Sequence, residues 1–249
     1  MKNYKELIYQ SYLQTCYKDL KSLLRFRLNP REAYLTNIVK RFFPKDRNSK
    51  ILDLGCGNGA LLYFAKKNGY QNIKGLDVSA MQVEEAGAIG LSEAEVECLD
   101  FVGHLENLPA ESYDFIISFD VLEHLSKQEI FNFGANVFRL LKKDGTWLIH
   151  APNGESLFGN RVLFGDFTHE ISFTCSSLEQ IKNALGFSKA FFFEDEPAVH
   201  GIKSLIRYLL WKLIRLMPAL WLAIETGSPG KIHSQNLIAL LKKQGQTKT

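Results

Sequence analysis

The feature that most constrains this chain is an apolar strand that runs straight into a loop of glycines. Residues 51–54 read Ile-Leu-Asp-Leu, and the next five read Gly-Cys-Gly-Asn-Gly. Glycine at alternate positions (Gly55, Gly57 and Gly59) permits positive φ and lets a ligand approach the backbone where a Cβ would block it. A helix that starts after such a loop offers unsatisfied N–H groups. The segment therefore predicts a strand, a ligand-binding turn and a helix.

Further strand-like runs alternate with helical patterns along the chain. They cover residues 50–54, 72–78, 95–100, 113–119 and 146–151. This alternation favours an α/β fold, with a parallel sheet and helices on both faces. In such a doubly wound sheet the ligand lies beyond the carboxyl ends of the strands, near the switch in strand order.

Local signals mark three helix starts. Asn29 before Pro30 is typical of a first helical turn, and Ser126 and Ser176 each have a glutamate three residues later, as in a capping box. We therefore expect helices to begin at these three places.

Asp53 narrows the class of ligand that the glycine loop holds. Read as Gly55-x-Gly57-x-x-Ala60, the loop also fits the fingerprint of dinucleotide-binding proteins, which cradle a pyrophosphate there. A carboxylate two residues before the first glycine would repel that phosphate. A ligand that carries an ammonium and a sulfonium group suits the loop better, and the dinucleotide remains the competing interpretation.

With these motifs the chain resembles the class I S-adenosylmethionine-dependent methyltransferases, from about residue 50 to 195 and with the motifs in the family's order. The resemblance implies a Rossmann-like seven-stranded sheet whose last strand, near residues 232–241, is antiparallel. It implies that Asp77 binds the ribose hydroxyls, for which an acceptor-only carboxylate is suited, and that Asp100 meets the adenine amino group. The full set of implied cofactor-binding residues is Asp53, Gly55, Gly57, Gly59, Asp77, Val78, Asp100, Phe101 and Asp120.

The chain is longer than this core fold requires. We expect residues 1–49 to form a helical N-terminal lid segment, and residues 50–249 to form the methyltransferase domain. Two insertions interrupt that domain, at 152–175 and 197–231. The first should rise beside the cofactor and bind the acceptor, because it follows the fifth strand at the ligand edge of the sheet.

Histidines near the methyl donor are the candidate bases. His169 is flanked by Asp166 and Glu170 within the first insertion, and carboxylates beside an imidazole raise its pKa and fix its tautomer. His124 follows the fourth strand and is the second candidate. An alternative is that Asp166, His169 and Glu170 only hold the loop together. These three could also bind a metal ion, but no second cluster in the sequence completes a site, so none is predicted.

A second resemblance narrows the chemical class of the molecule that accepts the methyl group. Residues 166–174 read Asp-Phe-Thr-His-Glu-Ile-Ser-Phe-Thr, and with residues 225–228 and 235–239 they resemble a bacterial methyltransferase group encoded among surface-polysaccharide and glycolipid genes. This implies O-methylation of a sugar hydroxyl on a glycan or glycolipid precursor.

No Pro-Pro-aromatic signature follows the fourth strand, and neither end carries a nucleic-acid module, so a nucleic-acid partner is not expected. The alternatives are another small molecule or a quinone-like lipid as acceptor, a NAD-dependent oxidoreductase, and a non-catalytic cofactor-binding partner protein.

Charge divides the chain into three parts. Residues 1–49 hold 11 Lys and Arg against 4 acids, residues 50–196 hold 11 against 22, and residues 197–249 hold 8 against 1. Basic ends that neutralise an acidic middle explain this pattern as well as an anionic partner such as membrane lipid does.

Cysteine usage and hydropathy bear on the compartment. Cys16, Cys56, Cys98 and Cys175 form no Cys-x-x-Cys pair, the start lacks the apolar core of a signal peptide, and no uncharged stretch reaches about 18 residues. We expect a cytoplasmic protein, attached at most peripherally to the inner face of a membrane.

Residues 202–224 offer such an attachment. Apolar side chains at helical spacing form a wide stripe that consists of Ile202, Leu205, Ile206, Leu209, Leu210, Leu213, Ile214 and Met217. Basic residues occupy the other faces. The stripe fits a helix packed on its own domain or in a homodimer, and it also fits a helix that lies in a membrane interface.

Overall fold

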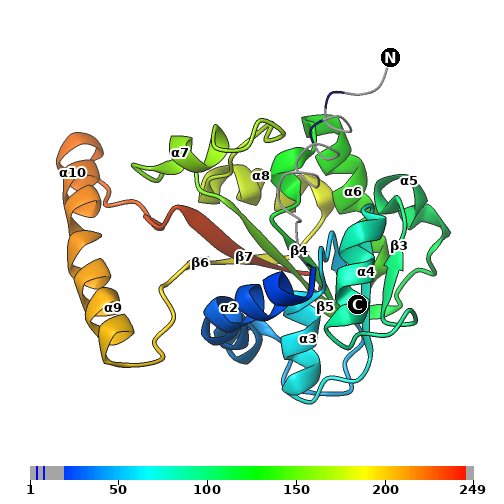
Figure 1. Ribbon diagram of the computed structural model, residues 1–249. Helices are drawn as coiled ribbons and strands as arrows, with labels where there is room; N and C mark the ends of the chain where they lie inside the picture. Colours follow the sequence, from blue (N-terminus) through cyan, green and yellow to red (C-terminus); the bar gives the residue numbers. More distant parts are fainter. Residues whose placement is uncertain (1–3, 5–7, 9–19, 245–249) are drawn as a thin grey trace.

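The computed structural model describes residues 4, 8 and 20–244, and it centres on one seven-stranded sheet (Figure 1). The strands lie in the order β3-β2-β1-β4-β5-β7-β6. Their bounds are β1 Ile51–Leu54, β2 Ile73–Asp77, β3 Val96–Cys98, β4 Tyr113–Phe119, β5 Leu141–Pro152, β6 Lys189–Glu194 and β7 Asn236–Lys242. Strand β7 pairs antiparallel with both β5 and β6, whereas β1 to β5 pair in parallel. The predicted Rossmann-like sheet with an antiparallel last strand is confirmed.

Helices cover both faces of this sheet. Figure 1 shows α2 and α3 on one side and α6 and α8 on the other. The helices are α2 Leu20–Phe42, α3 Ala60–Lys67, α4 Ala80–Ala88, α5 Phe101–His104, α6 Lys127–Leu140, α7 Gly159–Leu163, α8 Cys175–Leu185, α9 Ile202–Ile214 and α10 Leu216–Thr226, with 3-10 turns η1 Leu105–Asn107 and η2 Leu122–His124.

Successive side chains of the central strands point into two different cores. Ile51 packs in the core under α2, α3 and α4, whereas Leu52 packs in the core under α6 and α8. In β4, Phe115 likewise packs in the core under α2, α3 and α4, and Ile116 packs in the core under α6 and α8. The division follows from the two-residue period of a strand, and strands buried on both faces are apolar throughout. Because β1 to β5 are parallel, their carboxyl ends meet at one edge of the sheet.

The second half of helix α2 packs against the central domain. Leu35, Ile38, Val39 and Phe42 are buried in the same core as α3, because they recur at helical spacing on one face of α2. The second half of α2 therefore packs against the sheet and α3, and the domain boundary expected at residue 49 stays a prediction. Most of residues 1–19 lie outside the described part of the chain, so the lid remains a prediction there.

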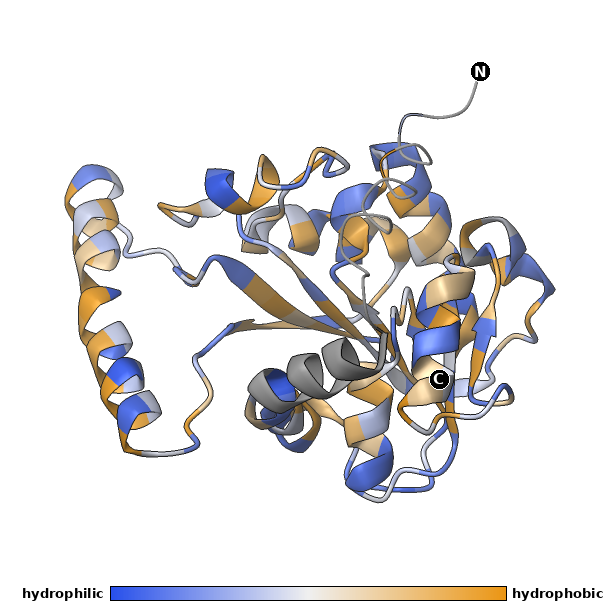
Figure 2. Ribbon diagram, viewed as in Figure 1, coloured by the Kyte–Doolittle hydropathy of each residue, from blue (hydrophilic) through white to orange (hydrophobic). Residues whose placement is uncertain are grey.

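Helices α9 and α10 form a rod that stands apart from the sheet (Figure 1). Helix α10 has no buried residue, and α9 buries only Ser204. Apolar side chains such as Met217 (71% exposed) and Trp221 (70% exposed) remain open, and orange apolar segments run along the rod in Figure 2. Packing on its own domain therefore does not explain the stripe, as far as the described residues extend.

Among the described residues, no helix has both the length and the apolar character required to cross a membrane.

Candidate active site

The glycine loop between β1 and α3 has the predicted backbone conformation. Gly55, Gly57 and Gly59 have φ values of 77°, 53° and 70°, in the region that favours glycine. A Cβ on Gly59 would collide with the side chain of Leu91, so the loop packs directly on the residues after α4. A Cβ on Gly57 would meet only Gln82, at 3.6 Å. The loop is thus fixed on one side and open to a ligand near Gly57.

Asp77, at the end of β2, lies beside this loop. Its Oδ2 accepts a hydrogen bond from the backbone N–H of Gly57 at 2.7 Å, and its Oδ1 accepts one from Ser79 at 2.9 Å. Burial raises the pKa of Asp77, and these two N–H groups partly oppose that rise. The structure thus brings together the loop and the acid that the sequence assigned to the ribose.

Asp53 is a buried acid with one oxygen that no described residue satisfies. Its side chain is 1% exposed, and Oδ1 has no hydrogen-bond partner among the described residues. Burial, reinforced by the charge of Asp77, raises the pKa of Asp53 to about 8. An unpaired buried carboxylate next to an open loop fits a ligand that carries positive charge, as S-adenosylmethionine does.

The adenine side of the predicted site is open. Asp100 is exposed, and the N–H of Leu99 donates to the carbonyl of Asp77 at 2.9 Å, so the ends of β2 and β3 lie together. Val78, at 53% exposure, adds an apolar surface. Phe101 begins α5, and its side chain lies outside the described part.

Asp120, after β4, is held by a residue that the sequence analysis did not select. Its Oδ1 lies 2.5 Å from Nδ1 of His150 on β5, and Asp120 itself has a positive φ of 57°. The His150 ring stacks on Phe119 at a centroid distance of 4.0 Å. Asp195, which follows β6, approaches the other ring nitrogen at 3.3 Å, and its Oδ1 accepts from the Tyr34 hydroxyl at 2.7 Å.

This network makes His150 a buried cation. Burial alone lowers the pKa of His150, but the charges of Asp120 and Asp195 outweigh it and raise that pKa to about 10. Burial also raises the pKa of Asp120, yet His150 reverses the direction and holds it below its usual value. Asp195 and Tyr34 could not be found from sequence spacing, because α2 and the segment after β6 meet only in the folded chain.

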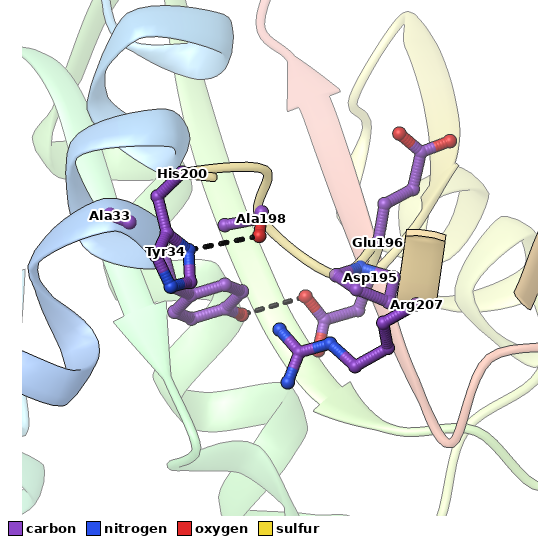
Figure 3. Close-up of a pocket in the computed structure, with 8 residues that line it drawn as sticks. Ala33, Tyr34, Asp195, Glu196, Ala198, His200 and Arg207 are labelled. Carbon is purple, nitrogen blue, oxygen red and sulfur yellow. Dashed lines mark hydrogen bonds between the residues drawn. The ribbon is translucent and has the colours of Figure 1, made fainter. Parts of the chain in front are cut away.

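A polar cavity of about 360 Å³ adjoins the network (Figure 3). Its polar lining consists of Tyr34, Asp195, Glu196, His200 and Arg207. Figure 3 shows the Arg207 side chain, from α9, extending toward Tyr34 and Asp195. The cavity therefore lies between α2, the segment after β6 and the first turns of the rod.

The predicted bases His124 and His169 lie together, after β4 and in the first insertion. Their ring centroids are 4.7 Å apart. Nδ1 of His169 lies 3.0 Å from the carbonyl oxygen of Val162, and Nδ1 of His124 lies 2.8 Å from Oγ1 of Thr168. The structure thus unites both candidates, one from η2 and one from the first insertion.

The two carboxylates beside His169 in the sequence accept hydrogen bonds from hydroxyl groups. Oδ1 of Asp166 accepts from the hydroxyl of Thr168 at 2.7 Å, and Glu170 accepts from the hydroxyl of Tyr4 at 2.7 Å. The hydrogen-bonded chain from Asp166 therefore leads through Thr168 to His124. Burial raises the pKa of Asp166, but the hydrogen bonds from Thr168 and the charges of His124 and His169 together hold that pKa below its usual value. The catalytic role expected for Asp166 beside His169 therefore stays a prediction.

Glu123 completes this cluster and was not predicted. It is 1% exposed, and its Oε2 has no hydrogen-bond partner among the described residues. Burial, with the charge of Asp120 adding to it, raises the pKa of Glu123 to about 8. One oxygen of Glu123 and one nitrogen from each of His124 and His169 lie within 4.8 Å of one another. The only sequence signal was the adjacency of Glu123 to His124.

Comparison with known proteins agrees with this geometry. Residues 27–190 match the family described as "Methyltransferase domain". Ribosomal protein L11 methyltransferase of Dictyoglomus turgidum is 32% identical over 110 residues, which are 43% of this chain and 34% of that protein. The chain thus matches about a third of the length of this relative.

Solved structures share the fold. A SAM-dependent methyltransferase from Archaeoglobus fulgidus superposes with a TM-score of 0.61 at 20% identity, over 94% of this chain and all of the other. Phosphoethanolamine N-methyltransferase 2 of Haemonchus contortus, in complex with S-adenosyl-L-methionine, gives 0.56 at 16% identity, over 85% of this chain and 52% of that one. The chain therefore belongs to the class I methyltransferase family, whose methyl donor is S-adenosylmethionine.

Proposed function

We propose that this protein transfers the methyl group of S-adenosylmethionine to a sugar hydroxyl on a glycan or glycolipid precursor. The observation that carries the proposal is the imidazole pair of His124 and His169 at the same sheet edge as the glycine loop. The bound cofactor supplies an electrophilic methyl group. The protein's part is to orient the acceptor oxygen and to remove its proton.

The protonation of the two rings suits that task. The Thr168 hydroxyl donates its single proton to Asp166, so it accepts from Nδ1 of His124. Nδ1 of His169 likewise donates to the Val162 carbonyl. Nδ1 therefore carries a proton in both rings, and Nε2 is the nitrogen left to accept a hydroxyl proton or to bind an ion.

The polar cavity supports a saccharide as acceptor. Its volume of about 360 Å³ falls within the range of ligand sites, and its hydroxyl, carboxylates, imidazole and guanidinium can pair with several sugar hydroxyls. The exposed apolar rod begins beside it and supports an acceptor that is linked to a lipid.

Two alternatives from other classes are less well supported. A NAD-dependent oxidoreductase would place pyrophosphate on the glycine loop, next to Asp53 and Asp77. A non-catalytic binding protein has no use for two imidazoles with fixed tautomers at the ligand edge. A quinone-like lipid or another small molecule remains the closest competitor as acceptor.

The test is methyl transfer from labelled S-adenosylmethionine to nucleotide sugars, lipid-linked saccharides and a quinol. We expect the label to appear as a base-stable ether on a saccharide. Label on the quinol or on an amine would refute the proposed acceptor. Cofactor binding with no transfer to any acceptor would favour the non-catalytic alternative.

A pair of histidine variants tests the site. His169→Ala should lower turnover roughly 100-fold, the usual effect of removing a general base or its equivalent, with little change in cofactor affinity. His233→Ala, a histidine outside the site, should leave turnover unchanged. Normal turnover in a correctly folded His169→Ala protein would contradict the assignment.

A further inference from the structure

Three side chains with metal-binding atoms converge at the acceptor side of the site. One oxygen of Glu123 and one ring nitrogen from each of His124 and His169 lie within 4.8 Å of one another. Donor atoms that each lie about 2.1 Å from one tetrahedral ion are about 3.4 Å apart. Side-chain movements of about 1 Å would therefore let the three groups share one ion.

The surroundings of the two histidines have the form found around metal ligands. A ligating histidine usually donates its second ring N–H to a carbonyl or to a chain that ends in a carboxylate, which leaves the other nitrogen for the ion. His169 donates Nδ1–H to the carbonyl of Val162 at 3.0 Å. His124 donates to Thr168, and Thr168 donates to Asp166, at 2.8 and 2.7 Å.

Glu123 provides a second, independent observation. It is 1% exposed, and Oε2 has no hydrogen-bond partner among the described residues. A buried carboxylate oxygen without a partner is costly, and coordination of a cation is one way to satisfy it. The first insertion is also hydrogen-bonded to η2 here, because the N–H of Glu170 donates to the carbonyl of Glu123 at 2.7 Å.

We propose that Glu123, His124 and His169 bind a divalent first-row transition-metal ion. Two imidazoles and one carboxylate favour ions such as Zn²⁺, Co²⁺ or Mn²⁺ over Mg²⁺, which prefers an all-oxygen shell. The sequence alone predicted no metal, because it offered only Asp166, His169 and Glu170. In the folded chain, Glu123 and His124 of η2 join His169 in the cluster, in place of Asp166 and Glu170.

Three protein ligands leave coordination positions open. Glu123 is buried whereas both histidines are partly exposed, so the open side faces away from the core. If the proposed function holds, a bound ion would take the acceptor hydroxyl at this open side and lower its pKa, and with both imidazoles bound to the ion the proton would leave to water. Transfer would then join that oxygen to the methyl carbon while the carbon–sulfur bond breaks, and the electron pair of that bond would stay on sulfur in S-adenosylhomocysteine. Ion binding itself does not depend on this role.

Calorimetry tests ion binding without any acceptor. Tag-free protein is treated with EDTA, dialysed, and titrated with Zn²⁺, Mn²⁺ and Co²⁺, and visible absorption of bound Co²⁺ reports nitrogen ligation. We expect one ion per chain. Glu123→Gln and His169→Ala should each weaken binding more than about 100-fold, and Thr168→Val, which removes only the support of His124, should weaken it about 10- to 100-fold.

Control variants separate this site from surface histidines. His104→Ala removes an exposed histidine outside the cluster and should leave ion affinity unchanged. Absence of binding by the unaltered protein, or unchanged affinity in folded Glu123→Gln and His169→Ala proteins, would overturn the proposal. Stoichiometric ion binding without methyl transfer to any saccharide would retain the metal site and refute only the proposed function.

Discussion

At the scale of single residues, the buried acid Asp53 links cofactor binding to pH. In the free protein its pKa lies at about 8, because the side chain is buried and Asp77 is near. Below that pH Asp53 is protonated. A cationic ligand stabilises the ionised form, so binding at lower pH must release a proton.

We therefore predict that the affinity for S-adenosylmethionine rises with pH between about 6 and 8, by at most about tenfold per pH unit for one proton. Above that range the affinity no longer rises with pH, since Asp53 is then ionised in the free protein. Calorimetry in buffers of different ionisation enthalpy measures the proton release directly. Asp53→Asn should bind with little pH dependence, and a dependence equal to that of the unaltered protein would exclude Asp53 as its source.

Residue-scale prediction reached furthest where the conformation is local in sequence. The positive φ values of Gly55, Gly57 and Gly59 follow from a strand that enters a tight turn. The placement of Asp77 beside this loop, 20 residues from Gly57, was expected only from the family resemblance. His150 and Asp195 could not be paired in advance. They are 45 residues apart, and their contact depends on how β6 packs in the sheet.

At the scale of helices and strands, sequence signals fixed some helix ends and missed others. Ser126 and Glu129 form the predicted capping box of α6. Helix α8 instead uses Thr174 and Ser177, because Thr174 is the last residue with an extended backbone before the helix. Helix α2 begins at Leu20 and continues through Pro30, where a helix start was predicted. Tertiary context outweighed the local signal at both of these positions.

The α9–α10 rod is the element whose role the sheet does not explain. Its apolar stripe is exposed, and residues 202–226 hold four basic side chains, Lys203, Arg207, Lys212 and Arg215, against one acid, Glu225. A basic amphipathic surface with exposed Trp221 has the composition of a helix that lies on anionic lipid. We propose that such a lipid surface covers the rod.

Co-sedimentation with vesicles that contain phosphatidylglycerol tests this proposal. The unaltered protein should bind them, and salt should weaken the binding. Leu209→Glu with Leu213→Glu should abolish it. Gln128→Glu with Asn132→Glu, which adds the same charge at the same spacing on exposed α6, should retain most of it. No vesicle binding, together with a stable dimer that the rod variant dissociates, would assign the stripe to a second copy of this chain.

At the scale of the whole molecule, one network centred on the buried His150 connects segments that are distant in sequence. Tyr34 comes from α2, Asp120 follows β4, His150 lies in β5 and Asp195 follows β6. Deep in the protein, a charged imidazole is stabilised only while both carboxylates face it. The cofactor edge and the polar cavity therefore share one structural support, which alternating strand patterns alone could not reveal.

This network predicts how the stability of the fold depends on pH. The pKa of His150 is about 10 in the folded protein and about 6.5 when unfolded, so the native state binds the extra proton between these values. The contribution of His150 is fully present below pH of about 6.5 and declines as pH rises toward 10, by up to about 1.4 kcal/mol per pH unit. Urea unfolding of the unaltered protein and of His150→Gln, at several pH values between about 6.5 and 10, measures this contribution to the free energy of unfolding. The variant should be less stable at neutral pH and show a shallower decline, because it lacks the titrating group. Parallel pH profiles for the two proteins would mean that His150 is not held as a cation.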